Sequence, residues 1–211
     1  MEEPRLQWYA MKVFYNKVFE TEALLAMRGI TTYLACDKVP LKGEAHTLAR
    51  KRIAAAKADG TPDNRYIEEG PVIYQRVPMV SALLFIEADE ESMKSFDADL
   101  ASGRLPVHGF LYKRWNEERS RYGLEPIPAK QMTSFRLATQ NGSGGLDFFS
   151  ADDIEKFAEG SKVRVTEGPF KGAEGYVKRI KRDRRLLISI EGIVAVATAH
   201  IEPRFLEPIG Q

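Results

Sequence analysis

Alternating apolar and polar residues predict strands in the last quarter of the chain. Between residues 162 and 166, Val163 and Val165 alternate with polar residues, which is the period of a strand with one buried face. Gly168 and Pro169 then interrupt the run, because glycine accepts positive φ and proline fixes φ. Similar runs follow Gly175 and fill residues 186–190 and 193–198. Four short strands in this order predict a small closed β-barrel.

The N-terminal half combines strand-like and helix-like patterns. Residues 6–14 read as an aromatic strand, and Phe19 to Met27 carry apolar side chains at helical spacing before Gly29. Further strands are predicted at 31–35, 77–88 and 107–112, and further helices at 89–102 and 126–137. This order predicts a mixed or antiparallel sheet flanked by helices, so the fold class is α+β with a C-terminal β-barrel.

A single Gly/Ser-rich stretch, residues 140–147, predicts where the two domains meet. We expect an N-terminal domain at 1–139 with an insertion at 42–76, a flexible linker at 140–149 and a C-terminal domain at 150–211. Ser150 or Asp152 is placed to cap a helical turn at the start of the second domain.

Composition narrows the remaining possibilities. The chain has 211 residues, 44% of them hydrophobic, and a net charge of +1, which fits two small globular domains. No apolar run near the N-terminus is long enough for a signal peptide or a membrane helix. The only cysteine, Cys36, forbids an internal disulfide and has no motif around it. We therefore expect a cytoplasmic protein with no membrane partner.

Positive charge is concentrated in the second domain. Between residues 171 and 185, seven Lys and Arg residues face two acidic residues, a local charge of +5. Such a ridge suits the phosphates of RNA, although charge runs are more often solvated turns, and Tyr176 is the only aromatic ring among them. The candidate binding residues here are Lys178, Arg179, Lys181, Arg182, Arg184 and Arg185.

A second basic segment lies in the predicted insertion. Residues 44–58 are rich in strong helix formers and include Arg50, Lys51 and Arg52. These cations are candidates for contact with DNA or RNA. Alternatively, Leu48 and Ile53 only pack the helix on the edge of a sheet and the charges are solvated.

The sequence offers no support for catalysis. His46, His108 and His200 are far apart and have no partners at metal-binding spacing. The glycines after Asn141 lack the preceding strand and following helix of a dinucleotide site, and no nucleophile or phosphate-binding loop motif is present. We expect neither an enzyme nor a cofactor.

Residues 160–207 closely resemble a KOW motif, in which an alternating strand is followed by Gly-Pro-Phe, two further glycines, a valine and an Arg-Leu strand. The matching positions are Val163, Val165, Gly168, Pro169, Phe170, Gly172, Gly175, Val177, Arg185 and Leu186. The alternative is a generic SH3-like module whose glycines serve only its turns.

The N-terminal half resembles the N-terminal domain of NusG-type transcription factors. The resemblance rests on the order of elements, on Trp8-Tyr9 in the first strand and on Ile127-Pro128 before the last helix. The two halves together are similar to a complete NusG-like protein. The long insertion is similar to those of the specialised RfaH and UpxY antiterminators, in which we expect such segments to carry operon specificity.

The resemblance implies a docking site for RNA polymerase. In the family, the first and central strands line a hydrophobic depression that receives two helices of the polymerase clamp. The matching positions are Lys12, Val80, Leu83 and Phe85, although only Phe85 keeps an aromatic ring where the family has a Leu-Phe-Pro-x-Tyr-x-Phe-Val run. The alternative is that the apolar residues are ordinary core.

The family's KOW domains bind a small-subunit ribosomal protein or the termination factor Rho, usually with an aromatic residue before the last strand. This chain has Glu191-Gly192 there, which disfavours Rho and makes Glu191 a candidate partner contact. We expect a transcription elongation factor or antiterminator that binds the clamp and contacts leader RNA or non-template DNA. The alternative is an RNA- or ribosome-binding KOW protein that does not dock on polymerase.

Overall fold

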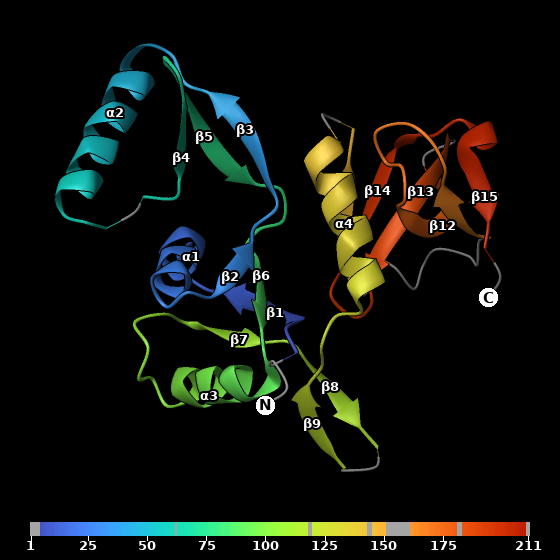
Figure 1. The fold of residues 1–211 in the computed structure, drawn as a ribbon, viewed down its shortest axis with the longest axis horizontal. Helices are drawn as coiled ribbons and strands as arrows, with labels where there is room; N and C mark the ends of the chain where they lie inside the picture. The colour runs from blue at the N-terminus through green and yellow to red at the C-terminus, as the bar shows by residue number, and fades with distance from the viewer. Residues whose placement is uncertain are drawn as a thin grey trace. The chain divides into compact units, whose positions relative to one another are not determined.

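The computed structural model describes residues 5–61, 63–117, 120–142, 145–150, 161–180 and 183–209. The chain divides into an N-terminal unit, Met1–Glu125, and a C-terminal unit, Pro126–Gln211 (Figure 1). Both units contain helix and antiparallel strand, so the α+β class is confirmed.

The N-terminal unit is built on a four-stranded antiparallel sheet, the central sheet. Its order is β2 (Thr31–Tyr33), β6 (Leu83–Ala88), β1 (Gln7–Val13) and β7 (Gly109–Leu111). The two middle strands, β1 and β6, pair over six residues although more than seventy residues separate them in sequence, from Gln7 opposite Ala88 to Lys12 opposite Leu83.

One face of the central sheet carries the core of this unit. Because side chains alternate along a strand, Tyr9, Met11 and Val13 of β1 share this face with the even-numbered residues of β6. Helices α1 (Val18–Met27) and α3 (Glu90–Ala101) pack against it through Val18, Leu25, Met93 and Phe96. Each helix ends before a glycine with positive φ, as the sequence predicts for Gly29 at 72°.

The predicted central strand at 77–88 is interrupted, and the first part belongs to another sheet. Pro78 ends β5 (Val72–Pro78), and Ala82, at φ 60°, turns the chain so that its carbonyl accepts a 2.8 Å hydrogen bond from the Val13 amide. Proline cannot donate to a ladder and a left-handed residue cannot continue one, so the apolar run forms two strands.

Strand β5 lies in the middle of a three-stranded sheet between β3 (Cys36–Pro40) and β4 (Tyr66–Glu69). Helix α2 (Gly43–Ala58) lies beside this sheet and buries Ala49 and Ile53 against Ile73 of β5 (Figure 1). We call residues 36–78 the insertion subdomain. It contains the predicted insertion at 42–76 and its predicted helix.

A two-stranded hairpin of β8 (Lys113–Asn116) and β9 (Arg121–Leu124) follows the central sheet. Its register pairs Trp115 with Tyr122, and the two rings pack edge to face with their centroids 5.2 Å apart. This hairpin is not among the elements predicted from the sequence.

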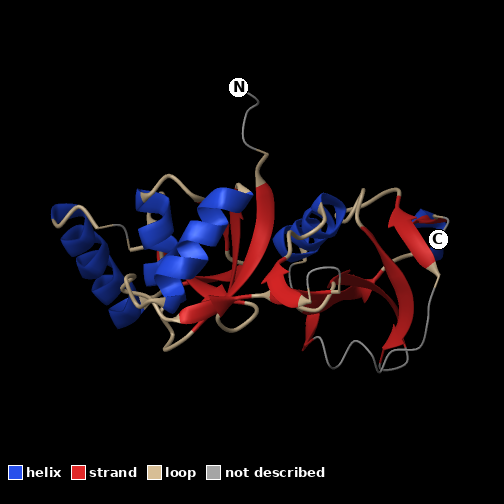
Figure 2. Ribbon diagram, turned by 90° about the horizontal axis from the view of Figure 1, so that it is seen from below, coloured by secondary structure: helices blue, strands red, loops and turns tan. Residues whose placement is uncertain are grey.

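The C-terminal unit combines helix α4 (Ala129–Asn141) with a six-stranded antiparallel sheet. In spatial order the strands are β10 (Asp147–Ser150), β14 (Val194–His200), β13 (Asp183–Ile190), β12 (Glu174–Ile180), β11 (Lys162–Val165) and β15 (Leu206–Pro208), with a short 3₁₀ helix, η1 (Pro203–Phe205), before the last. Figure 2 shows these strands curving strongly. The strands predicted from Val163 to Thr198 are confirmed, whereas closure into a barrel stays a prediction.

Helix α4 packs on this sheet, which moves the boundary between the units. Ser134 Oγ accepts a 2.9 Å hydrogen bond from the Glu174 amide, and the side-chain oxygen of Gln131 accepts one of 3.2 Å from the Glu191 amide. The units divide after Glu125 rather than after residue 139.

The predicted flexible linker at 140–149 is partly regular structure. Its first two residues end α4, and Asp147 to Phe149 belong to β10, where Phe148 pairs with Val196 of β14. Aromatic residues such as Phe148 and Phe149 favour strands, whereas the glycines of the same segment led to its prediction as a linker. Asp152, a predicted cap, lies outside the described residues.

We expect Gly109→Ala to destabilise the N-terminal unit. A Cβ at Gly109 would lie 2.1 Å from the backbone oxygen of Lys12, so β7 must move away from β1. Overpacking of this kind costs about 1–3 kcal/mol. Thermal and urea unfolding will measure the change. Gly123→Ala is the matched control, because a Cβ there meets no atom within 4 Å, and equal losses in both variants would contradict the close contact.

Candidate binding surfaces

The second face of the central sheet brings together three of the four predicted polymerase-binding residues. Lys12 pairs with Leu83, and Phe85 lies two residues along β6 on the same face. Leu83 and Phe85 are 4% and 1% exposed, and Lys12 is half-buried. The Lys12 ammonium donates a 3.1 Å hydrogen bond to the Ser81 carbonyl. Val80, the fourth residue, is half-buried in the turn before β6 and not on the strand.

Aromatic side chains that are not among the predicted site residues line the β7 edge of the central sheet. Phe14 and Tyr15 follow β1, and His108, Phe110 and Tyr112 lie on or beside β7. Their rings form an unbroken series of contacts, which we call the aromatic row. The available signal was the alternation of His108, Phe110 and Tyr112, which places three rings on one side of a strand.

Helix α2 presents its predicted binding residues to solvent. Arg50, Lys51 and Arg52 are exposed, while Ala49 and Ile53 face the sheet of the insertion subdomain. The Arg52 guanidinium donates a 3.2 Å hydrogen bond to the Tyr66 hydroxyl. The helix therefore packs through Ala49 and Ile53 and keeps Arg50 and Lys51 accessible to a ligand. Leu48, which one alternative expected in this packing, is 52% exposed.

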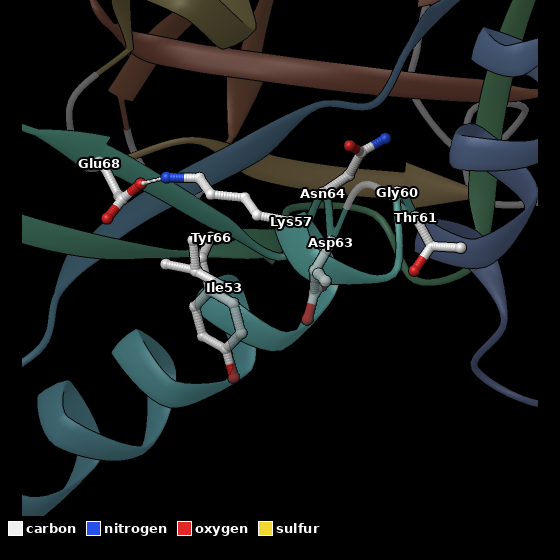
Figure 3. A pocket seen from close by; sticks show the side chains of 9 residues that line it. Ile53, Lys57, Gly60, Thr61, Asp63, Asn64, Tyr66 and Glu68 are labelled. Atoms are coloured by element: carbon white, nitrogen blue, oxygen red, sulfur yellow. Dashed lines mark hydrogen bonds and ion pairs between the residues drawn. The ribbon is translucent and has the colours of Figure 1, made fainter.

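A pocket of about 350 Å³ opens between α2 and β4 (Figure 3). Lys57 and Glu68, two of its lining residues, pair at 2.6 Å, and Asp63 accepts a 3.1 Å hydrogen bond from the Arg65 amide. The charged groups thus satisfy one another. Among the described residues, no group of three or more His, Cys, Asp or Glu side chains could hold a metal ion.

A buried ion pair joins the insertion subdomain to α1. Arg76 of β5 donates to both carboxylate oxygens of Glu22 at 2.6 and 2.9 Å, and also to the Asn64 carbonyl at 2.8 Å. Glu22 is 7% exposed. The guanidinium carbons of Arg76 and Arg65 lie 5.4 and 5.8 Å from the centroid of the Phe19 ring, and Arg65 pairs with Glu20 at 2.5 Å. We call this cluster the junction.

Cys36 borders the junction at the start of β3. Burial raises the pKa of the Cys36 thiol to about 11, despite the nearby Arg76 charge, which lowers it. The thiol is therefore neutral near pH 7, and its environment is that of a passive residue, as the sequence indicates.

We expect Glu22→Gln to destabilise the protein, because Arg76 keeps a buried charge without its carboxylate. Removing one partner of a buried pair costs about 3–5 kcal/mol, against at most about 1 kcal/mol for an exposed pair. Chemical unfolding of Glu22→Gln, Arg76→Met and the double variant will measure the coupling. Glu68→Gln, which breaks the exposed Lys57–Glu68 pair, is the control, and a loss as small as the control's would contradict the role of the junction.

The predicted basic ridge of the C-terminal unit separates into exposed and buried parts. Lys178 and Arg179 lie on β12, where the Lys178 ammonium is 5.9 Å from the centroid of the Tyr176 ring. Arg184 lies opposite Arg179 on β13. Lys181 and Arg182 lie outside the described residues. Glu191, in the turn before β14, is exposed.

Arg185 has a structural position that corrects its assignment as a binding residue. Its guanidinium donates to the Asp147 carboxylate and to the carbonyls of Gly145 and Thr198, and its side chain is 10% exposed. These contacts connect β13 to β10 and β14. An arginine in a charge run was counted as exposed, because the sequence does not show which face of β13 it occupies.

Residues 159–201 match the KOW motif. The match includes β11 to β14, so these strands form a KOW module within the C-terminal unit. No curated protein shows significant similarity to the chain. Within the described parts, no helix is long and apolar enough to cross a membrane.

We expect Arg185→Ala to release β10 from the KOW module. Hydrogen exchange at residues 147–150 should accelerate by about tenfold or more, since one charge-assisted hydrogen bond contributes about 1.5–3 kcal/mol. Exchange measured by mass spectrometry will test this result. Arg179→Ala, at an exposed position on the neighbouring strand, is the control. Equal protection of β10 in both variants would contradict the structural role.

Proposed function

We propose that the protein is a NusG-like transcription elongation factor of the antiterminator kind. The observation that carries the proposal is a KOW motif following an α+β unit whose central sheet has Lys12, Leu83 and Phe85 on one face. In NusG-type factors the equivalent face receives two helices of the RNA polymerase clamp. The second face would be the docking surface, with Val80 beside it.

The mechanism requires contacts and no chemistry. A factor bound to the clamp and extending across the cleft holds the clamp closed, which suppresses pausing and favours processive elongation. Leu83 and Phe85 would form the apolar floor of the docking surface, and Lys12 and Val80 its more accessible part. Interfaces concentrate their binding energy in a few such central residues.

The other candidate residues supply secondary contacts in this proposal. Arg50 and Lys51 on α2 would approach leader RNA or non-template DNA, and the insertion subdomain would select the target operon. The KOW module would contact RNA or a ribosomal protein through Lys178, Arg179 and the turn at Glu191. Phosphate contacts from these cations weaken steeply with salt.

The second candidate is an RNA- or ribosome-binding KOW protein that does not dock on polymerase. The contact between Lys178 and the Tyr176 ring favours it, because a cation beside an exposed aromatic ring suits both the phosphate and the base of RNA. In this case the N-terminal unit would have another role.

Binding of the full chain to RNA polymerase core enzyme tests the proposal. We expect Lys12→Glu and Val80→Asp to weaken binding by about tenfold or more, since each change places an unpaired carboxylate in an apolar interface. Both positions are half-buried, so circular dichroism must first confirm folding.

Arg179→Glu in the KOW module is the control and should keep polymerase binding. If about 1 µM wild-type protein retains no polymerase, the RNA- or ribosome-binding candidate replaces the proposal. Unchanged binding by both folded variants would exclude the second face as the docking surface.

A further inference from the structure

The aromatic row is a connected series of five rings. The Phe14 centroid lies 6.2 Å from that of Tyr15 and 5.9 Å from that of Phe110. Tyr15 continues the series to His108 at 5.6 Å, and Phe110 continues it to Tyr112 at 5.4 Å. The row thus connects the end of β1 to both ends of β7.

Four of these rings are exposed to a degree that packing does not require, and the fifth, Tyr112, is half-buried. Tyr15 is 76% exposed, Phe110 46% and Phe14 42%, and His108 is also exposed. Single exposed apolar residues are normal on a protein surface, whereas a contiguous patch marks an interaction site. The core on the opposite face of the sheet is complete without these rings.

The backbone holds the row in place at a cost. Tyr15 has φ 56°, in the left-handed region that a bulky residue rarely adopts. Gly109 allows β7 to approach β1 so closely that a Cβ would overlap the Lys12 oxygen. Both features bring His108 and Phe110 next to the rings after β1. A strained residue within an exposed aromatic cluster indicates a functional site.

The two segments that supply the row are basic and contain no acidic residue. Residues 12–17 and 106–114 contribute Lys12, Lys17, Lys113 and Arg114, in addition to His108. Lys17, Lys113 and Arg114 form ion pairs with Glu20, Asp97 and Glu125, and in each pair at least one side chain is more than a third exposed. Exposed pairs of this kind are weak, so these cations can exchange partners with phosphate.

We propose that the aromatic row binds single-stranded nucleic acid by stacking unpaired bases on its rings, with phosphates next to Lys12 and Lys17. Ring faces accept any base, whereas bases in a duplex are stacked on one another and cannot reach them. The cations of these two segments can pair with the phosphates of a polyanion, which argues for nucleic acid rather than an uncharged partner.

This site goes beyond the proposed function. It uses residues outside α2 and the basic ridge of the KOW module. Because Phe110 lies opposite Lys12, the row borders the proposed docking surface and shares Lys12 with it, but the binding of an oligonucleotide to the free protein requires no polymerase. An isolated full chain should therefore bind a single strand even if the clamp does not bind the protein.

Fluorescence anisotropy of labelled oligothymidine and oligouridine with the full chain tests the proposal. We expect Tyr15→Asn and Phe110→Ala each to weaken binding by about fivefold or more, the effect of losing one stacked base. Asparagine tolerates a positive φ, so Tyr15→Asn removes the ring without disturbing the turn. Tyr15→Phe keeps the ring and should bind like the wild type. Comparison of the two probes will show whether DNA or RNA is preferred.

The dependence on salt separates stacking from phosphate contact. Loss of a ring should lower affinity at every salt concentration without changing the slope of log K against log salt, because rings release no counterions. Tyr122→Ala, in the exposed hairpin, is the control that should keep most of the affinity.

Three results would overturn the proposal. The first is binding weaker than about 100 µM to both probes, the limit of ordinary non-specific binding. The second is a loss of affinity in Lys178→Ala with none in the folded Tyr15 and Phe110 variants, which would place the strand on the KOW module. The third is a loss of polymerase binding, and not of oligonucleotide binding, in those variants, which would assign the row to a protein partner.

Discussion

The antiparallel pairing of β1 with β6 is the constraint on which the N-terminal unit depends. It joins residues near the start of the chain to residues more than seventy positions later and fixes which side chains share each face. A shift of one residue would exchange the core face, with Tyr9 and Leu84, for the face with Lys12 and Phe85. The buried contacts of α1 and α3 with the first face therefore also determine the position of the proposed docking surface.

The sequence predicted those elements whose hydrophobic period is undisturbed. The helix before Gly29, the helix of residues 44–58 and the strands of the KOW module all appear where expected, because their patterns and end signals agree. The apolar run from Val77 was wrongly predicted as one strand. Its apolar composition was given more weight than Pro78, and the positive φ of Ala82 cannot be read from the sequence. The pairing of β10 with β14 depends on tertiary contact, which the local composition of β10 does not reveal.

The candidate binding residues also divide into those that the sequence identified and those whose role depends on tertiary contact. The resemblance to the NusG family selected Lys12, Leu83 and Phe85, and the register of β1 with β6 places them on one face. Arg185 was misassigned because its role depends on the Asp147 carboxylate, which another strand supplies. The aromatic row joins residues after β1 to residues around β7, so the alternation of His108, Phe110 and Tyr112 signals only one part of it.

The register of β3 and β5 brings the two ends of the insertion subdomain together, with Cys36 directly opposite Pro78. The chain thus leaves the central sheet and returns to it at almost one point. A segment with adjacent ends is exchangeable: a shorter or unrelated segment can close the same gap at little entropic cost while β2 and β6 keep their pairing. A replacement segment would have to keep the contacts of the junction with α1 or fold without them. The insertion subdomain can therefore change during evolution while the strands of the central sheet keep their pairing.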